Sequence, residues 1–451
     1  MDRFYLKNAP RYHTLINALD PFPKPRITTG KTGSNMVVSA RIRPLPDDEE
    51  FASAVFPRAN PKNMVDVHDL YNHPKGLPIL KSSEYQIDKI FGTTSTTEKI
   101  YQDLIADLVP YAWNGGIGTL FAYGQTGSGK TFTISKVEEL IAETIMSGDL
   151  LGDREVHMTI IDLAGNAAFD LLNERNPIPL LEDSSGTTQM AGVQEIKVST
   201  ANEMRDVVER ASSFRRTAPT VKNPASSRSH AICRIRIKNL VNNSEGMLYL
   251  IDLAGSEAAR DVAVHGADRM RETRQINISL SVLKDCIRAK AEADTANNLN
   301  GGGGDQKVPH IPFRRSALTR VLKHVFDPAS TRACKTVVIA CVSPSLADVG
   351  PTKNTLRFAE LLRVLVPAAD EGEDKSAMSW TNEQVKEWIK NNCGKPPILS
   401  NVVAPRESGA QLFKLSTEEI EYRCKKCPGV KHKQAQEFRA KLWQMYLSPE
   451  T

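Results

Sequence analysis

An eight-residue phosphate-binding pattern constrains this chain more than any other feature of its sequence. Residues 124–131 read Gly-Gln-Thr-Gly-Ser-Gly-Lys-Thr, which is the complete GxxxxGK(S/T) pattern. An apolar run typical of a strand leads into it, and a run of helical character follows from Val137 to Met146. The glycines let backbone N–H groups surround phosphates, and the N-terminus of the helix adds a favourable dipole. The pattern therefore predicts a nucleotide-phosphate site at a strand end; a glycine-rich turn without a ligand is the alternative.

Each residue of this phosphate loop has an expected role. We expect Lys130 to reach the β- and γ-phosphates and the Thr131 hydroxyl to coordinate Mg²⁺. The other residues of the loop should contact the phosphates. They are Gly124, Gln125, Thr126, Gly127, Ser128 and Gly129.

Two later segments have the composition expected of elements that sense the γ-phosphate. Residues 223–230 (NPASSRSH) cluster hydroxyl groups that can bind Mg²⁺, water and phosphate. Residues 252–257 (DLAGSE) directly follow the apolar run MLYLI. Asp252 should therefore stand at a strand end and hold the Mg²⁺ shell through water, while the Gly255 N–H can bond the γ-phosphate.

These two segments also carry opposite charges, and one of their motifs is repeated. We expect Arg228 and Glu257 to form a salt bridge between the segments. The sequence DLAG also occurs at 162–165, but only the second copy continues into Ser-Glu and follows the SSRSH sequence. We therefore assign the metal shell to Asp252 and a structural role to Asp162.

Short β-rich runs alternate with longer helical runs from residue 36 to about residue 363. Apolar residues make up 40% of the chain and charged residues 25%, which is ordinary globular composition. Nearly continuous apolar strands with intervening helices predict an α/β fold, with a central, mostly parallel sheet and helices on both faces.

Changes in composition divide the chain into four parts. Residues 1–34 end in a Pro-, Gly- and Thr-rich stretch and read as a basic, flexible lead-in. Residues 35–366 form the main domain, in which four consecutive glycines predict a flexible surface loop at 289–309. Residues 367–377 are an acidic linker, and residues 378–447 are helical in character.

The composition also excludes several classes of protein. The apolar runs are far shorter than the roughly 20 residues of a transmembrane helix. The N-terminal residues lack the apolar core of a secretory leader, and seven scattered cysteines are too few for a disulfide framework. We expect a reduced, cytoplasmic protein without membrane contacts.

Basic charge is concentrated in two segments. The chain has a net charge of +5; residues 1–34 hold six basic and two acidic side chains, and residues 268–323 hold eleven and six. The remainder is close to neutral. Local basic surfaces favour one acidic partner over general nucleic-acid binding, and ordinary solvated faces are the alternative.

The motifs and their order resemble those of the kinesin motor domain. The resemblance covers roughly residues 35–365. Its carriers are ARIRP (40–44), FAYGQTGSGKT (121–131), NPASSRSH (223–230), LIDLAGSE (250–257), INISL (276–280), PFRRSALT (312–319) and TLRFAE (355–360). It implies a P-loop NTPase motor fold, hydrolysis of ATP with Mg²⁺, microtubules as partner, and a place on the microtubule cytoskeleton, with the spindle as one option.

The resemblance assigns further roles at the nucleotide site, residue by residue. It implies that Arg41 and Pro44 flank the adenine and that Gly255 senses the γ-phosphate. It also implies that four residues position the attacking water, bind the metal or close the site. They are Ser227, Ser229, Arg228 and Glu257.

A microtubule-binding face is the second implication of the resemblance. It should comprise the long helix after the DLAGSE segment and the segment after the glycine-rich loop, whose local charge suits acidic tubulin. Each basic residue alone could be an ordinary solvated side chain, so the prediction concerns the cluster. Its members are Arg269, Arg271, Arg274, Lys284, Arg314, Arg315, Arg320 and Lys323.

One class within the family matches best. The stretch VLKDCIRAK (282–290) resembles LKECIRAL of the microtubule-depolymerising internal-motor kinesins, the kinesin-13 class. The basic lead-in resembles their neck, and the segment 65–88 is long enough for their tubulin-wedging loop. The Lys-Val-Asp tip of that loop is not found; the nearest text is Met64-Val65-Asp66. We expect depolymerisation at microtubule ends, with a translocating motor or a low-turnover tether as alternatives.

The C-terminal part, residues 378–447, resembles a SAM domain. It has a Trp-led first helix, a Gly-x-x-Leu turn and a long terminal helix. The resemblance implies binding to a protein partner or self-association, which could oligomerise a translocating motor. A zinc site is suggested by Cys424 and Cys427 with His432 and Cys393, but the incomplete spacing favours structural cysteines.

Overall fold

The structure is a computed structural model, and it describes most of the chain. The described residues are 2–19, 31–32, 35–59, 61–73, 76–148, 150, 152–183, 188–217, 228–256, 266–299, 310–326, 332–363, 365–366, 380–412, 415 and 417–447. They form two compact units, Met1–Val366 and Pro367–Thr451, each of which is described by itself. Among these residues no helix is both long and apolar enough to span a membrane.

Ten strands form the central sheet of the first unit. They are β2 (Met36–Ile42), β6 (Lys89–Phe91), β7 (Ile117–Tyr123), β8 (Arg154–Ala164), β9 (Ala167–Asp170), β10 (Asn176–Ile178), β13 (Ile196–Val198), β14 (His230–Asn239), β15 (Glu245–Asp252) and β16 (Cys334–Val342). Their order is β10-β9-β8-β14-β15-β7-β16-β2-β6, with β13 beside β8.

This sheet is mixed, which corrects the mostly parallel sheet predicted from the sequence. The strands β15, β7, β16, β2 and β6 are parallel, whereas β14, β8, β9, β10 and β13 join through antiparallel pairs. The physical reason is the length of the connections. Only a few residues separate β8 from β9 and β14 from β15, and such short turns can join only antiparallel neighbours.

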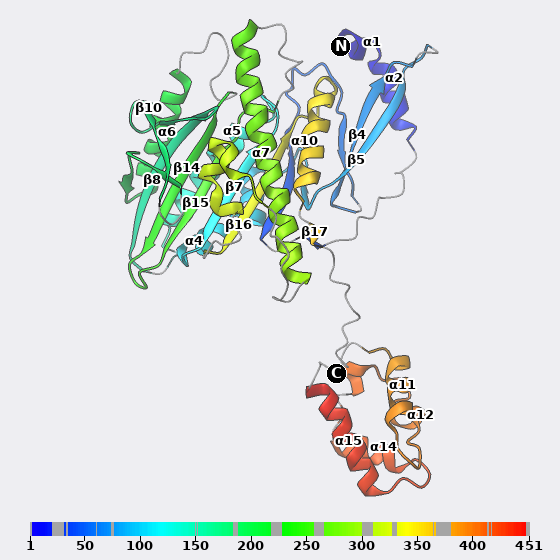
Figure 1. Ribbon diagram of the computed structural model, residues 1–451. Coiled ribbons are helices and arrows are strands. Elements are labelled where there is room, and N and C mark those ends of the chain that lie inside the picture. The colour runs from blue at the N-terminus through cyan, green and yellow to red at the C-terminus, as the bar shows by residue number, and fades with distance from the viewer. Residues whose placement is uncertain are drawn as a thin grey trace. The chain divides into compact units, whose positions relative to one another are not determined.

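Helices cover both faces of the sheet (Figure 1). One face carries α3 (Thr97–Ile100), η1 (Tyr101–Ile105), α4 (Leu108–Trp113), α5 (Lys130–Met146) and α6 (Ala201–Thr217). The other carries α7 (Gly266–Leu299), η4 (Phe313–Arg315), α8 (Ala317–Val321), α9 (Lys323–Phe326), η5 (Leu346–Asp348) and α10 (Val349–Leu362). All seven residues of β7 are buried. Its consecutive residues Leu120 and Phe121 belong to the apolar cores on opposite faces of the sheet. The predicted helix–sheet–helix layering is therefore confirmed.

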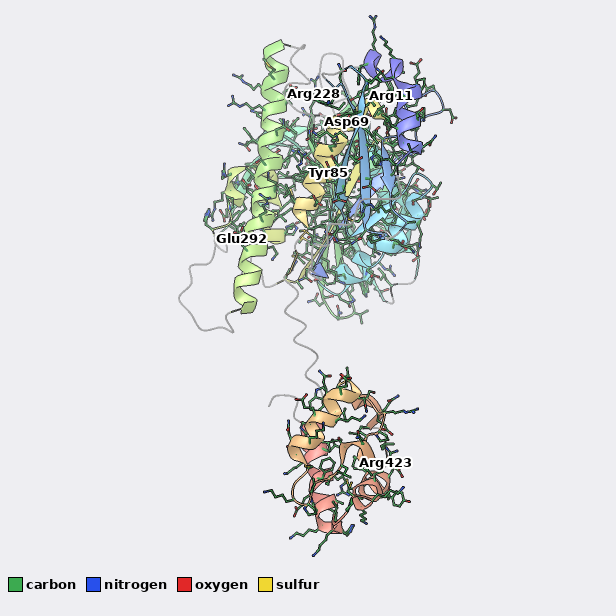
Figure 2. All side chains as sticks on the ribbon, turned by 90° about the vertical axis from the view of Figure 1, so that its right-hand side faces the viewer. Arg11, Asp69, Tyr85, Arg228, Glu292 and Arg423 are labelled. Carbon is green, nitrogen blue, oxygen red and sulfur yellow. The ribbon has the colours of Figure 1, made fainter. Side chains whose placement is uncertain are left out.

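Two short N-terminal helices pack against a separate three-stranded sheet. The helices are α1 (Asp2–Lys7) and α2 (Ala9–Asn17), and the strands are β3 (Val55–Pro57), β4 (Met64–Tyr71) and β5 (Ile79–Gln86). The buried Tyr12 donates its hydroxyl proton to the Ser53 carbonyl at 2.9 Å, and the buried Tyr5 donates to Asp69 at 3.1 Å. The predicted flexible lead-in is thus wrong for α1 and α2, because these tyrosines bury their rings. The labels Arg11 and Asp69 mark this region in Figure 2.

The strands β4 and β5 form a regular hairpin, paired from Met64↔Gln86 to Tyr71↔Ile79. Asp66 lies inside it, 2% exposed, and accepts two hydrogen bonds of 2.7 Å from Arg58. The Met64-Val65-Asp66 sequence therefore lies within a strand and not at a loop tip. Two smaller pairs complete this unit: β1 (Lys31–Thr32) with β17 (Leu365–Val366), and β11 (Leu180–Glu182) with β12 (Thr188–Met190).

The second unit is all-helical in its described residues. Its helices are α11 (Asn382–Asn392), α12 (Ser400–Val403), α13 (Gly409–Leu412), α14 (Thr417–Lys425) and α15 (His432–Leu447). A capping box of Thr381 and Gln384 begins α11, and the unit has its own apolar core, which includes Ile389 and Phe438. Its all-helical character was predicted; the SAM resemblance stays a prediction. Cys424 and Cys427 are buried, and no cluster of three metal-ligating side chains occurs among the described residues.

Candidate nucleotide and microtubule sites

The phosphate loop joins the end of β7 to the start of α5. Gly124 has φ of +153°, and a Cβ at this position would lie 2.2 Å from the carbonyl oxygen of Cys341. Only glycine fits there, because the neighbour is backbone of the adjacent strand β16 and cannot move aside. Gly129, with φ of +96°, turns the chain into Lys130, the first residue of α5.

Internal hydrogen bonds hold this loop in a curve. The Ser128 hydroxyl and the Lys130 ammonium both donate to the Gln125 carbonyl oxygen, at 2.8 Å each. These three residues are buried, whereas Thr126 and Gly127 are exposed. The middle of the loop is therefore open to solvent while its two ends are held in place by hydrogen bonds, an arrangement that suits phosphate binding.

The groups expected to hold the metal lie next to this loop. The Thr131 hydroxyl donates to Oδ2 of Asp252 at 2.9 Å. The other carboxylate oxygen, Oδ1, is buried and accepts no hydrogen bond from any described residue. The buried Ser229 precedes β14, the strand beside β15. Hydroxyl and carboxylate oxygens of this kind are the ligands that Mg²⁺ prefers, so the residues present fit the expected metal.

An arginine that sequence reasoning missed joins the two DLAG motifs. Asp162 and Asp252 lie on either side of Ala231 in the sheet. Arg215 of α6 donates to Asp252 and to the Ser229 carbonyl, both at 2.8 Å, and its Nε lies 3.7 Å from Asp162. All three charged side chains are less than a tenth exposed. No motif surrounds Arg215, so nothing in the sequence pointed to it.

Arg41 and Phe132 lie on the side of the loop where the adenine is expected. Arg41 donates to the Thr133 hydroxyl at 2.8 Å, and its guanidinium lies 5.3 Å over the Phe132 ring. Phe132 is 67% exposed, and Pro44 is also exposed. An exposed ring beside a cation suits stacking with a flat base. Phe132 directly follows the phosphate pattern, which is the signal that could have found it.

The residues expected to close the site are only partly described. Ser227 and Glu257 lie outside the described residues, so the salt bridge between Arg228 and Glu257 stays a prediction. Arg228 lies 3.2 Å from the Glu272 carboxylate of α7, and Figure 2 shows it beside that helix. Gly255 is buried just beyond β15.

His230, the first residue of β14, is buried and bonded through both ring nitrogens. The Ala254 N–H donates to its Nδ1 at 3.1 Å, and its Nε2 lies 2.8 Å from the Ser279 hydroxyl of α7. Burial, together with the positive charges of Arg215 and Lys130, lowers the pKa of His230 to about 3. A pKa this low makes the ring a weak base, and both of its nitrogens are already hydrogen-bonded, which suits a structural role better than general-base catalysis.

One further acid lies close to the metal residues and was not predicted. Glu138 of α5 lines a small cavity of about 50 Å³ together with Thr131, Arg215 and Asp252. Burial and the Asp252 carboxylate raise the pKa of Glu138 to about 8, so this side chain is mostly protonated at pH 7. It belongs to no motif.

The expected microtubule-binding residues lie on α7 and on the short helices that follow it. Arg271, Arg274, Arg314 and Arg315 are exposed; Lys284, Arg320 and Lys323 are half-buried; the side chain of Arg269 lies outside the description. The structure brings α7, η4 and α8 into contact. The cluster therefore draws on elements that are adjacent in space.

Several of these basic residues have acidic partners within the chain. Arg314 and Lys323 both contact the Glu182 carboxylate of β11, at 2.7 and 3.4 Å. Arg315 lies 4.0 Å from Asp285 of α7. The pair of Arg314 and Glu182 is open to solvent, with 64% and 29% of the side chains exposed. Their charges can therefore exchange partners at low cost.

The comparison with protein families decides what this arrangement is. A family model described as the kinesin motor domain matches residues 41–365. The chain belongs to the kinesin family. Members of this family are microtubule-dependent ATPases, and the matched range takes in the phosphate loop, β14, β15 and α7.

Individual relatives agree with this assignment. The chain is 35% identical over 336 residues to Diatom spindle kinesin-1 of Cylindrotheca fusiformis, covering 74% of this chain and 51% of the relative. It is 32% identical over 400 residues to Kinesin-like protein KIN-13B of Arabidopsis thaliana, covering 85% and 54%. The chain thus spans about half the length of these curated relatives.

Solved kinesin structures share the fold. One is a KIF14 dimer with AMP-PNP in complex with a microtubule. It matches with a TM-score of 0.58 and 26% identity, over 74% of this chain and 94% of that one. The kinesin motor fold predicted from the sequence is confirmed.

Proposed function

We propose that this chain is a microtubule-stimulated ATPase that couples ATP hydrolysis to microtubule binding and to depolymerisation at microtubule ends. The observation that carries the ATPase is the convergence of Thr131, Ser229 and Asp252 beside the loop that ends at Lys130. The microtubule assignment is supported by family membership and by the exposed arginines of α7. A place on the microtubule cytoskeleton follows from it.

Hydrolysis at this site needs positioning and charge stabilisation more than covalent chemistry. Lys130 and the loop N–H groups hold the β- and γ-phosphates, and Arg41 with Phe132 orients the base. Ser229 positions the attacking water beside the Gly255 N–H. Bound Mg²⁺ supplies charge neutralisation on the phosphates. Arg215 keeps the Asp252 carboxylate oriented toward the water shell of the metal.

Depolymerisation is the finer part of the proposal. It is supported by the VLKDCIRAK stretch and by the similarity to the Arabidopsis protein over 85% of the chain. The β4–β5 hairpin is a specific argument for the alternative, a translocating motor. Its connection between Tyr71 and Ile79 reads NHPKGLP and lacks the Lys-Val-Asp tip. A low-turnover tether is a third possibility, against which the complete phosphate loop counts.

One experiment separates these activities. The full chain is incubated with stabilised microtubules and ATP, while phosphate release, filament length and filament gliding are recorded. Shortening from the ends with stimulated phosphate release supports depolymerisation, and gliding without shortening supports translocation. Binding without stimulated phosphate release would contradict both and leave the tether.

The C-terminal unit is proposed as a protein-interaction module that binds a partner or a second copy. Its separate core and its resemblance to a SAM domain support this role. Light scattering of the full chain, compared with a chain that ends at residue 366, tests self-association. Equal oligomeric states of the two would leave only the binding of a different protein.

A further inference from the structure

A chain of hydrogen bonds runs from the DLAGSE segment to α7 through His230. Its Nδ1 accepts the N–H of Ala254, the residue before Gly255, at 3.1 Å. Its Nε2 lies 2.8 Å from the Ser279 hydroxyl, which donates its own proton to the Ile276 carbonyl at 2.7 Å. Nδ1 therefore carries no proton, and the Ser279 hydroxyl has already donated its own. Nε2 must then carry the ring proton and donate it to the Ser279 oxygen. The imidazole thus has both nitrogens engaged.

Burial makes these contacts hard to exchange. Ala254, His230 and Ser279 are 0%, 2% and 4% exposed, so water cannot replace a lost partner at little cost. Arg228, two residues before His230, forms an ion pair with Glu272 of α7, the helix that also carries Ser279. Residues 228–230 therefore contact α7 at two places, Glu272 and Ser279, which lie seven residues or about two helical turns apart.

We propose that His230 is a positioning residue that transmits the state of the γ-phosphate-sensing segments to α7 through Ser279. The inference rests on the proposed function, because α7 carries the expected microtubule-binding arginines. A displacement of Ala254 on gain or loss of the γ-phosphate moves the ring, and the ring moves Ser279. By reciprocity, a microtubule bound on α7 changes nucleotide affinity by the same factor.

The substitution Ser279→Ala tests this contact without touching a nucleotide ligand. It removes the acceptor of the Nε2 proton and leaves the phosphate loop and the metal residues unchanged. Ser281→Ala is the matched control, since Ser281 is exposed on the same helix. Ser279→Thr keeps the hydroxyl and should retain the coupling. Ser279→Cys, whose thiol is a weak acceptor, serves as the second disrupting variant if the alanine variant does not fold.

The first measurement needs no microtubules. Hydrogen–deuterium exchange is recorded for the full chain with Mg²⁺ and either ADP or a non-hydrolysable ATP analogue. In the unchanged protein and in Ser281→Ala, we expect exchange in both α5 and α7 to depend on the nucleotide. In Ser279→Ala, the dependence should persist in α5 and fall to less than half in α7. An unchanged nucleotide response of α7 in Ser279→Ala, or none in the unchanged protein, overturns the proposal.

The second measurement uses microtubules. In the unchanged protein, the microtubule dissociation constant should differ between the two nucleotide states. In Ser279→Ala, the ratio of these two constants should be about tenfold closer to one. ATP turnover without microtubules should stay within about twofold, in line with a residue that contacts no nucleotide. A merely structural role would instead lower the melting temperature and reduce turnover with and without microtubules in parallel, which contradicts the proposal. If the unchanged protein ignores microtubules while α7 still responds to nucleotide, the proposed function fails and the coupling through His230 stands.

Discussion

The two charged regions of the motor unit pair their charges in opposite ways. Around the residues expected to hold the metal, Arg215 of α6 lies between Asp162 of β8 and Asp252 of β15, the strands on either side of β14, and all three side chains are less than a tenth exposed. On the side of α7 and α8, Arg314 pairs with Glu182 in contact with solvent. The buried charges are fixed because an unpaired charge in the interior is costly. The exposed charges are replaceable, which suits a surface that must bind and release an acidic polymer.

Breaking the buried network should have the largest effect. Arg215→Ala leaves two buried carboxylates without their shared cation, and we expect it to lower the free energy of unfolding by about 3–5 kcal/mol. Urea unfolding monitored by circular dichroism measures this loss. Arg314→Ala is the matched exposed control and should leave the midpoint nearly unchanged. Equal losses in both variants would remove the distinction between the two regions.

The next largest effect should come from a substitution in the phosphate loop. Lys130→Ala removes the cation expected on the β- and γ-phosphates, and we expect phosphate release to fall about 10²–10³-fold. Lys136→Ala, on the same helix but paired with Glu139 at the surface, is the control and should keep its turnover. Retained turnover in Lys130→Ala would mean that phosphates bind elsewhere.

Two histidines with lowered pKa values, the buried His230 and the half-buried His324, extend the comparison to the effect of pH. Burial lowers the pKa values of His230 and His324 to about 3, against 6.5 for a free side chain. The unfolded chain therefore binds protons that the folded chain does not, so stability is lost as the pH falls from about 6.5 toward 3. Each histidine should contribute up to about 1.4 kcal/mol per pH unit in this window.

His324→Phe tests this expectation. The phenyl ring can keep the stacking on Tyr249, where the rings are 4.3 Å apart. The free energy of unfolding is measured with urea at pH 6.5, 5.5 and 4.5. It should decrease less steeply with falling pH in the variant, and the difference in slope should correspond to about one bound proton. Parallel curves would mean that His324 has the same pKa in the folded and the unfolded protein, which contradicts the expectation.

The exposed pair should have the smallest effect. Glu182→Gln frees Arg314 and Lys323 from their internal partner, and we expect microtubule affinity to rise about two- to fivefold at low salt. Cosedimentation at several salt concentrations measures this change, which salt should diminish. Lower affinity in Glu182→Gln would indicate that Glu182 orients the two cations for binding.

The fold was predictable where the sequence pattern is local and was missed where distant segments meet. The apolar runs and the phosphate pattern predict the buried strand β7 and the start of α5. The antiparallel half of the sheet depends on the short turns between β8 and β9 and between β14 and β15, and apolar runs alone do not show which strands become neighbours. The helices α1 and α2 were missed because their stability comes from Tyr5 and Tyr12 packing on a sheet formed by residues 55–86.

For the site, the sequence by itself determined which chemical groups are present. A glycine-rich loop with Lys130 and Thr131, and an aspartate at a strand end, have few other uses, so their spacing is enough. Only the tertiary structure decided that Arg215 joins the two DLAG aspartates, that Phe132 stands beside Arg41, and that His230 bonds to Ser279. The reason is that these contacts join elements far apart in the chain or depend on burial. Spacing along a sequence records neither.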